Sequence, residues 1–357
     1  MKHAVQGNRA LCDGAIAGGL DAYYAYPITP QNEISAYFSQ VLPERGKVFL
    51  QAESEIAAIN MVFGSAVAGK RALTTSSSPG ISLMQETISY LCACELPCVI
   101  ANVMRGGPGL GNISGSQQDY FQSTRGGGHG DYRMLVLAPA GAVEIFTFAR
   151  DAFALAEKYR NPVLIVYDGY LGQMLETVDG DPASLAGPPL PTEPPDRSWV
   201  LDGASAGRPP RKIRSLLMQE GDLEALNWRL HAKYERMASA EVRWEEISVE
   251  DAEIVLVAFG MAARVCTAAC KRLRAEGVRA GLIRPITLWP FPEQAIARAA
   301  ERVRRMLVVE MNLGQMVEDV RRVAAGRIPV DFHGRPGGSL VIEEDIVAAV
   351  RRSGAAS

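Results

Sequence analysis

The sequence predicts an α/β protein made of two three-layer αβα domains with mainly parallel sheets. Short, almost continuously apolar runs recur along the chain, longer segments with helical spacing separate them, and the pattern restarts after a stretch rich in proline and glycine. Apolar runs without alternation are typical of parallel strands covered on both faces. We therefore expect one domain over residues 1–182, a linker and a charged helix over 183–250, and a second domain over 251–357.

In the first domain, five apolar runs are predicted to form buried strands: 48–50, 72–75, 97–103, 134–137 and 162–167. Apolar residues at helical spacing lie between several of these runs, over 55–69, 83–94 and 142–159. Repeated strand–helix–strand units favour a parallel sheet with helices on both faces.

Proline and glycine are concentrated after residue 182, which indicates a linker, and a charged helix is expected over 222–245. The second domain begins with the apolar strand 252–260. Its remaining expected elements are helices at 262–276, 293–304 and 314–325 and strands at 280–283, 306–310 and 328–332.

The bulk composition is that of an ordinary globular protein, with 48% hydrophobic and 22% charged residues. A net charge of −3 argues against nucleic acid or an anionic membrane as a partner. No apolar run reaches the length of a membrane span, and the N-terminus lacks the features of a signal peptide. Six cysteines in 357 residues do not resemble a secreted disulfide framework. These observations favour a cytoplasmic protein.

The cysteines do not predict a metal site. Cys92, Cys94 and Cys98 have C-x-C-x3-C spacing, which differs from the ferredoxin pattern. Cys266 and Cys270 lie one helical turn apart and are expected to pack in a core. We predict no metal ligands in this chain, because the sequence also lacks a Gly-Asp-Gly segment followed by asparagine that could hold Mg²⁺ and a diphosphate.

Three polar residues admit both a structural and a chemical role. Thr29 precedes Pro30, as a helix N-cap precedes proline at the first helical position. Glu55 begins a predicted helix, where a carboxylate interacts favourably with the helix dipole. Arg105 ends an apolar strand before a glycine loop, where a surface arginine is common. Spacing alone favours the structural role for each of them.

Taken together and in order, the segments around these residues resemble the α subunit of 2-oxoacid:ferredoxin oxidoreductases. The matching segments are Tyr-Pro-Ile-Thr-Pro at 26–30, Glu-Ser-Glu-Ile-Ala-Ala at 53–58 and Arg-Gly-Gly-Pro at 105–108. Residues 117–122 and 125–133 resemble the branched-chain (2-oxoisovalerate) branch of that family. Residues 284–292 are similar to its transketolase C-terminal-like domain, so the resemblance covers essentially the whole chain.

The resemblance implies that residues 1–182 form the pyrimidine-binding-like domain of a thiamine-diphosphate enzyme. The implied reaction is the CoA-dependent oxidative decarboxylation of a 2-oxoacid to acyl-CoA and CO₂, with reduction of ferredoxin. The resemblance assigns Glu55 to the pyrimidine ring of thiamine diphosphate, with Pro27 and Ile28 beside the cofactor. It assigns Arg105 and Thr29 to the oxygens of the substrate, where a guanidinium can clamp a carboxylate with two parallel hydrogen bonds.

Gly107, Asn112 and His129 are further candidates for a substrate loop. Residues 107–112 superficially resemble a dinucleotide loop, but they lack the G-x-G-x-x-G register. The glycine-rich segment that contains His129 is equally compatible with a flexible turn.

The family resemblance also implies that this chain holds only half of a catalytic site. Mg²⁺ and the iron–sulfur clusters would belong to other subunits: a diphosphate-binding β subunit, a γ subunit and a ferredoxin-like δ subunit. The second domain is expected mainly to assemble subunits. Three alternatives stay open: a subunit specific for 2-oxoglutarate or pyruvate, the β-type subunit of a lipoamide-linked 2-oxoacid dehydrogenase, and a non-catalytic scaffold.

Overall fold

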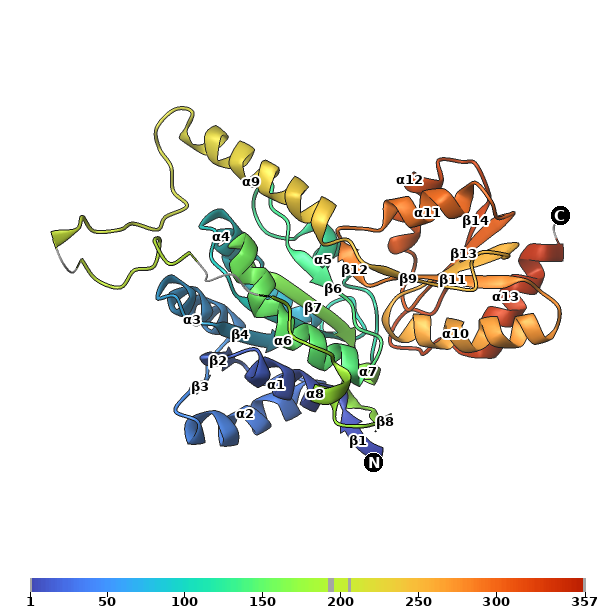
Figure 1. Ribbon diagram of the computed structural model, residues 1–357, viewed down its shortest axis with the longest axis horizontal. Coiled ribbons are helices and arrows are strands. Elements are labelled where there is room, and N and C mark those ends of the chain that lie inside the picture. The colour runs from blue at the N-terminus through green and yellow to red at the C-terminus, as the bar shows by residue number, and fades with distance from the viewer. Residues whose placement is uncertain (1, 192–195, 205–206, 356–357) are drawn as a thin grey trace.

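A computed structural model of the chain describes residues 2–191, 196–204 and 207–355. Two layered units lie side by side, each with a mainly parallel sheet between helices (Figure 1). The predicted α/β class with parallel sheets is confirmed.

The first sheet has seven strands, of which only β12 runs antiparallel to its neighbour. In spatial order they are β12 (Thr287–Trp289), β6 (Leu135–Leu137), β7 (Val163–Asp168), β5 (Val99–Met104), β4 (Ala72–Ser76), β2 (Ala22–Ala25) and β3 (Val48–Gln51).

Alternate residues of the central strands point to opposite faces of this sheet. Since both sets of residues are apolar, helices cover both faces. In β7, Val163 and Ile165 belong to the core under α1 (Gly7–Ala17), α2 (Asn32–Glu44) and α6 (Ala142–Tyr159). Leu164 and Val166 belong to the core under α3 (Glu55–Val67) and α4 (Ser78–Ala93). Two short helices, α5 (Tyr120–Arg125) and α7 (Gly169–Gln173), lie in loops at the ends of strands.

The second sheet has five strands and repeats this layering. In spatial order they are β14 (Val330–Gly334), β13 (Arg305–Glu310), β10 (Ile254–Val257), β11 (Ala280–Pro285) and the antiparallel β9 (Trp244–Ile247). The helices α10 (Gly260–Ala275) and α13 (Glu343–Ala355) share one core, and α11 (Glu293–Ala300) and α12 (Met316–Ala324) share the other.

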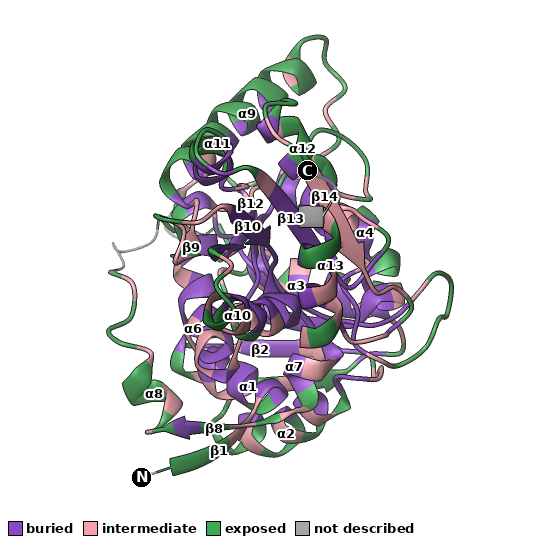
Figure 2. Cartoon of the chain, turned by 90° about the vertical axis from the view of Figure 1, so that its right-hand side faces the viewer, coloured by how far each residue is buried: buried purple, intermediate pink, exposed green. Residues whose placement is uncertain are grey.

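The remaining elements lie outside these two units. A two-stranded ribbon pairs β1 (Lys2–Gln6) with β8 (Leu175–Asp179), and the short helix α8 (Pro182–Leu185) follows it. Helix α9 (Asp222–Ala240) packs Leu226, Leu230 and Tyr234 against the first unit, while most of its surface is exposed (Figure 2).

Several sequence expectations need correction. The strand β3 was expected to be buried, but Val48 and Leu50 are exposed because β3 is the edge strand and pairs only with β2. The charged helix expected over 222–245 ends at Ala240, and the residues after it form β9 of the second sheet.

The predicted domain limits, 1–182, 183–250 and 251–357, stay a prediction. Two strands cross them: β9 precedes residue 251 but joins the second sheet, and β12 follows residue 251 but extends the first. The two units are therefore joined by β12, which extends the first sheet from within the second part of the chain, as well as by the chain that links them.

None of the helices described by the structure is long and apolar enough to cross a bilayer. All six cysteines are unpaired and buried. Cys266 and Cys270 pack in the core beneath α10, as predicted, and burial raises the pKa of both thiols.

Candidate active site at one edge of the first sheet

The candidate residues follow neighbouring strands of the first sheet at the same edge. Thr29 follows β2, Glu55 follows β3, and Arg105 follows β5 directly. These strands are mutually parallel, so their carboxyl ends meet at one edge of the sheet. In open α/β sheets, ligands bind outside the carboxyl ends of the strands.

Glu55 is the first residue of α3, and its side chain is buried, with the residue only 6% exposed. The helix is capped by its neighbour, since the Ser54 hydroxyl accepts a hydrogen bond from the N–H of Ala57 at 3.1 Å. Among the described residues, none donates a hydrogen bond to the Glu55 carboxylate. Since Ser54 caps the helix and the Glu55 carboxylate has no described donor, this group is suited to a ligand rather than to capping.

One buried hydroxyl without a partner, that of Ser76, lies in the same neighbourhood as this carboxylate. The hydroxyls of Thr74 and Ser77, next to it along the chain, also have no hydrogen-bond partner within the described parts of the chain. Gly80 in the first turn of α4 allows the close approach: a Cβ there would lie 2.0 Å from Ser76 Oγ and 2.7 Å from Glu55 Oε1. The Glu55 carboxylate and the Ser76 hydroxyl therefore lie around a glycine where any side chain would displace one of them.

We expect Gly80→Ala to displace Glu55 and Ser76, although alanine is the better helix former. Overpacking of this kind costs about 1–3 kcal/mol, so the free energy of unfolding should fall despite the gain in helix propensity. Thermal unfolding of the full chain measures this, and Gly64→Ala is the matched control. An added Cβ at Gly64, in the neighbouring helix α3, meets nothing within 4 Å. The control should be stabilised, and equal stabilisation of both variants would contradict the crowding described here.

Arg105 is buried, which rules out the surface role that its spacing suggested. Its Nη1 donates to the carbonyl of Thr29 at 2.9 Å, and its Nη2 donates to the carbonyl of Leu110 at 3.0 Å. Its Nε has no partner in the described structure. Because a guanidinium carries five N–H donors, Arg105 retains donors for an anionic ligand.

The expected N-cap role of Thr29 is wrong. Helix α2 starts at Asn32, and its N-cap position is occupied by Gln31, whose side chain is buried against the hydroxyl of Thr75. Thr29 lies in the turn before the helix, where its hydroxyl accepts a hydrogen bond from Asn32 at 3.2 Å. Pro27 and Ile28 lie in the partly exposed segment between β2 and this turn.

Arg105 and the start of α4 are tied together by a small polar network. The backbone N–H of Arg105 donates to Ser78 Oγ at 3.0 Å, and this hydroxyl donates to the Asp119 carboxylate at 2.5 Å. Asn102 donates to the same carboxylate at 2.8 Å. Burial raises the pKa of Asp119, while the hydrogen bonds from Ser78 and Asn102 act in the opposite direction.

The weaker candidates occupy two different loops. Gly107 donates its N–H to the side chain of Gln118 at 2.8 Å, and Asn112 donates to the carbonyl of Gly337 in the second unit at 2.8 Å. His129 is exposed, and no described contact joins it to Glu55 or Arg105. The structure therefore brings Gly107 and Asn112, but not His129, into the loop that follows Arg105.

Sequence reasoning missed the polar residues at the carboxyl ends of β4 and β5, among them Ser76, Ser78 and Asn102. The signal was present, because residues 74–78 are an unbroken run of threonine and serine at the end of a predicted strand. Such a run at a strand end of a parallel sheet lies where ligands bind.

A further acidic residue, Asp168, lies at the end of β7. It is fully buried, and its Oδ1 accepts hydrogen bonds from the backbone N–H groups of Tyr170 and Leu171, which caps α7. Burial raises the pKa of Asp168 to about 6, against the opposing effect of these backbone donors.

This pKa predicts a pH dependence of stability. Between about pH 4 and 6 the folded state holds a proton on Asp168 that the unfolded state has lost. The contribution of Asp168 to the free energy of unfolding therefore declines as pH rises through this window. The total contribution is on the order of 3 kcal/mol. Asp168→Asn should remove this decline while it keeps an oxygen to cap α7. Unfolding of both full chains between pH 4 and 7.5 measures the difference; parallel curves would show that Asp168 does not titrate there.

Comparisons with known proteins identify the class of protein that this fold and site belong to. The family model described as pyruvate flavodoxin/ferredoxin oxidoreductase, thiamine-diphosphate-binding, matches residues 13–204. The model described as pyruvate:ferredoxin oxidoreductase core domain II matches residues 252–346. The chain belongs to the 2-oxoacid:ferredoxin oxidoreductase family, a family of thiamine-diphosphate-binding oxidoreductases.

Within this family the chain is similar to subunits named for a branched-chain 2-oxoacid. It is 47% identical over 349 residues to the ketoisovalerate oxidoreductase subunit VorB of Methanothermobacter thermautotrophicus, covering 97% of this chain and 96% of that protein. It is 37% identical over 365 residues to the 2-oxoglutarate synthase subunit KorA of the same organism, covering 97% of each protein. The predicted resemblance to the branched-chain branch is confirmed.

Solved structures agree with this assignment. A 2-oxoglutarate:ferredoxin oxidoreductase from Magnetococcus marinus matches with a TM-score of 0.87 and 28% identity, over 98% of this chain. The present chain spans only 65% of that longer chain. A split-gene transketolase matches with a TM-score of 0.62 and 16% identity, which shows a shared fold only.

Proposed function

We propose that this chain is the subunit of a 2-oxoacid:ferredoxin oxidoreductase that holds the pyrimidine end of thiamine diphosphate and binds the 2-oxoacid. The observation that carries the proposal is the buried Glu55 carboxylate, which has no donor among the described residues. The ketoisovalerate relatives support a branched-chain substrate such as 3-methyl-2-oxobutanoate.

The residues present fit the aminopyrimidine of this cofactor. Such a ring has two polar features. One ring nitrogen can share a proton with a carboxylate, and the amino group can donate a hydrogen bond to a hydroxyl. Glu55 supplies the carboxylate, and the unpartnered hydroxyl of Ser76 supplies an acceptor. When bound, thiamine diphosphate provides the nucleophile and the electron sink for decarboxylation.

In this proposal the chain's own residues hold a proton and position the substrate. Glu55 shares a proton with the ring nitrogen, a task for which a positioned carboxylate is suited. Arg105 binds the substrate carboxylate through the N–H groups that Thr29 and Leu110 leave free. The Thr29 hydroxyl, close to Arg105 in the chain fold, donates to a substrate oxygen, so the two residues fix the orientation of the ketone.

We further propose that partner subunits complete the site. A β subunit would hold the diphosphate and Mg²⁺, while γ and ferredoxin-like δ subunits would complete the complex and other subunits would hold the iron–sulfur clusters through which ferredoxin is reduced. The relatives' names, each of which denotes a subunit, support an assembly of several chains. Six unpaired, buried cysteines support a location in the cytoplasm.

The assembled complex, purified under anaerobic conditions, tests this proposal. CoA-dependent reduction of a viologen dye should be measured with 3-methyl-2-oxobutanoate, 2-oxoglutarate and pyruvate as alternative substrates. The proposal predicts activity that requires both CoA and thiamine diphosphate, with the highest kcat/KM for 3-methyl-2-oxobutanoate.

Other outcomes discriminate among the alternatives. A preference for 2-oxoglutarate or pyruvate would replace the proposed substrate and leave the proposed reaction unchanged. Transfer of the acyl group to lipoamide without dye reduction would favour the dehydrogenase alternative. A complex without any 2-oxoacid-dependent activity would overturn the proposed function.

A further inference from the structure

The loop that follows Arg105 is closed at its base and then attached to the second unit. Arg105 forms an antiparallel bridge with Gly115, and the N–H of Gly106 donates to the carbonyl of Ser114 at 2.9 Å. Directly after this base, Ser116 Oγ donates to the carbonyl of Met311 at 3.1 Å. We call residues 106–119 the clamp loop.

Gln117 makes the central attachment and is completely buried. Its Nε2 donates to the carbonyl of Phe259 at 2.8 Å, and its Oε1 accepts from the N–H of Met311 at 3.1 Å. Its backbone N–H donates to the carbonyl of Met311 at 3.1 Å, and its carbonyl accepts from Asn312 Nδ2 at 2.8 Å. Every one of these partners belongs to the second unit, where Phe259 follows β10 and Met311 follows β13.

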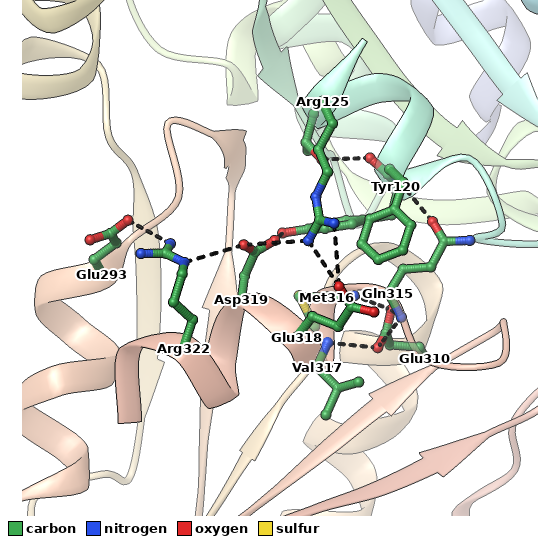
Figure 3. A network of polar contacts seen from close by, with 12 residues as sticks. Tyr120, Arg125, Glu293, Glu310, Gln315, Met316, Val317, Glu318, Asp319 and Arg322 are labelled. Carbon is green, nitrogen blue, oxygen red and sulfur yellow. Dashed lines mark hydrogen bonds and ion pairs between the residues drawn. The ribbon is translucent and has the colours of Figure 1, made fainter. Parts of the chain in front are cut away.

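Hydrogen bonds within the second unit fix the start of α12, and Figure 3 shows Glu310 beside Gln315, Met316 and Val317. The buried carboxylate of Glu310 accepts hydrogen bonds from the N–H groups of Met316 at 2.8 Å and Val317 at 3.0 Å, which caps α12. Glu310 also accepts from Asn312 at 2.9 Å. Gln315, at the start of α12, donates to the carbonyl of Gln118 at 2.7 Å.

The clamp loop in turn holds the guanidinium of Arg105. The carbonyl of Leu110, near the tip of the loop, accepts from Arg105 Nη2 at 3.0 Å. Gln118, near the end of the loop, contacts its beginning, since Gln118 Oε1 accepts a hydrogen bond from the N–H of Gly107 at 2.8 Å. The second unit is therefore linked to Arg105 in two kinds of step. Hydrogen bonds attach Gln117 and Gln118 to the second unit and Gln118 to Gly107, and the backbone continues from Gly107 to Leu110, whose carbonyl accepts from Arg105.

We propose that Gln117 is a positioning residue through which the second unit sets the orientation of Arg105 for binding the substrate carboxylate. This inference rests on the proposed function. It gives the second unit a role in substrate binding, beyond the assembly of subunits that its sequence suggested. Gln117 itself need not touch substrate, because it acts through the loop that carries Leu110.

The test is Gln117→Met in the assembled complex, because methionine keeps the length of the side chain and removes its amide. The hydrogen bonds to Phe259 and Met311 are lost, while both backbone bonds of residue 117 can remain. We expect KM for the 2-oxoacid to rise about tenfold, as a small misplacement of a binding group predicts, with kcat changed less than twofold and KM for CoA unchanged. Hydrogen exchange of peptides covering 106–116 should become faster.

Arg264→Met is the matched control at another contact between the units. Arg264 in α10 donates to the carbonyl of Ala140 at 3.0 Å and pairs with Glu176 at 3.0 Å, remote in sequence from the clamp loop. This variant should leave KM for the 2-oxoacid and exchange in 106–116 unchanged. An equal rise of KM in the control would show a general effect of domain packing and would overturn the inference.

If Gln117→Met does not assemble, Gln315→Met applies the same test from the second unit, because it removes the bond to Gln118. An unchanged KM in an assembled variant, or a loss of kcat alone, would overturn the positioning role. Failure of this inference can be told apart from failure of the proposed function. The proposed function fails only if the unaltered complex shows no 2-oxoacid-dependent activity.

Discussion

Replacing Glu55 with glutamine is expected to lower kcat of the assembled enzyme by about 10²–10⁴-fold, the range for loss of a positioned acid–base group. The amide has the same shape, so it fills the buried position beside Ser76 and Gly80 without a cavity. It cannot share a proton with a ring nitrogen as a carboxylate does. Because the carboxylate has no described donor to lose, thermal stability of the full chain should be unchanged.

Glu53→Gln provides the matched control for this experiment. Glu53 lies two residues away in the same segment, but its side chain is exposed. The control should retain full activity, and both variants should assemble with their partner subunits. Full activity of Glu55→Gln in an intact complex would favour the scaffold alternative over a catalytic role.

The second large effect is expected at Arg105. Arg105→Lys retains the positive charge but loses the planar group that binds Thr29 and Leu110 and clamps a carboxylate, so kcat/KM should fall about 100-fold. The loss should be similar for 3-methyl-2-oxobutanoate and pyruvate, because both substrates carry the same carboxylate beside the ketone. Steady-state kinetics of the complex with each 2-oxoacid measures this.

Arg45→Lys, at an exposed position after α2, is the corresponding control and should behave like the unaltered enzyme. A selective loss for the branched substrate alone would contradict carboxylate binding by Arg105. It would indicate instead that the residue shapes the pocket for the aliphatic side chain.

Elements with long apolar periodicity were predictable from the sequence, and elements defined by long-range pairing were not. The helix predicted over 142–159 has those bounds in α6, and residue 55 begins α3 as predicted. The short strand β12 could not be assigned to the first sheet, because its partner β6 lies about 150 residues earlier in the chain. The exposure of β3 likewise depends on its place at the edge of the sheet.

The candidate site shows the same division. Local spacing and family segments identified Glu55, Thr29 and Arg105, and the sheet order brings them to one edge. Local spacing could not show that Ser54 rather than Glu55 caps α3, nor that Gln117 is bonded wholly to the second unit. These are properties of tertiary contacts, which a single sequence does not display.

The most direct test is a structure of the assembled complex with thiamine diphosphate bound, since every role proposed here depends on which chain holds the pyrimidine. We predict hydrogen-bond contact between the carboxylate of residue 55 and a nitrogen of that ring, with the diphosphate and its Mg²⁺ on a different subunit. A ring remote from residue 55, or a cofactor held within one partner subunit, would contradict this account.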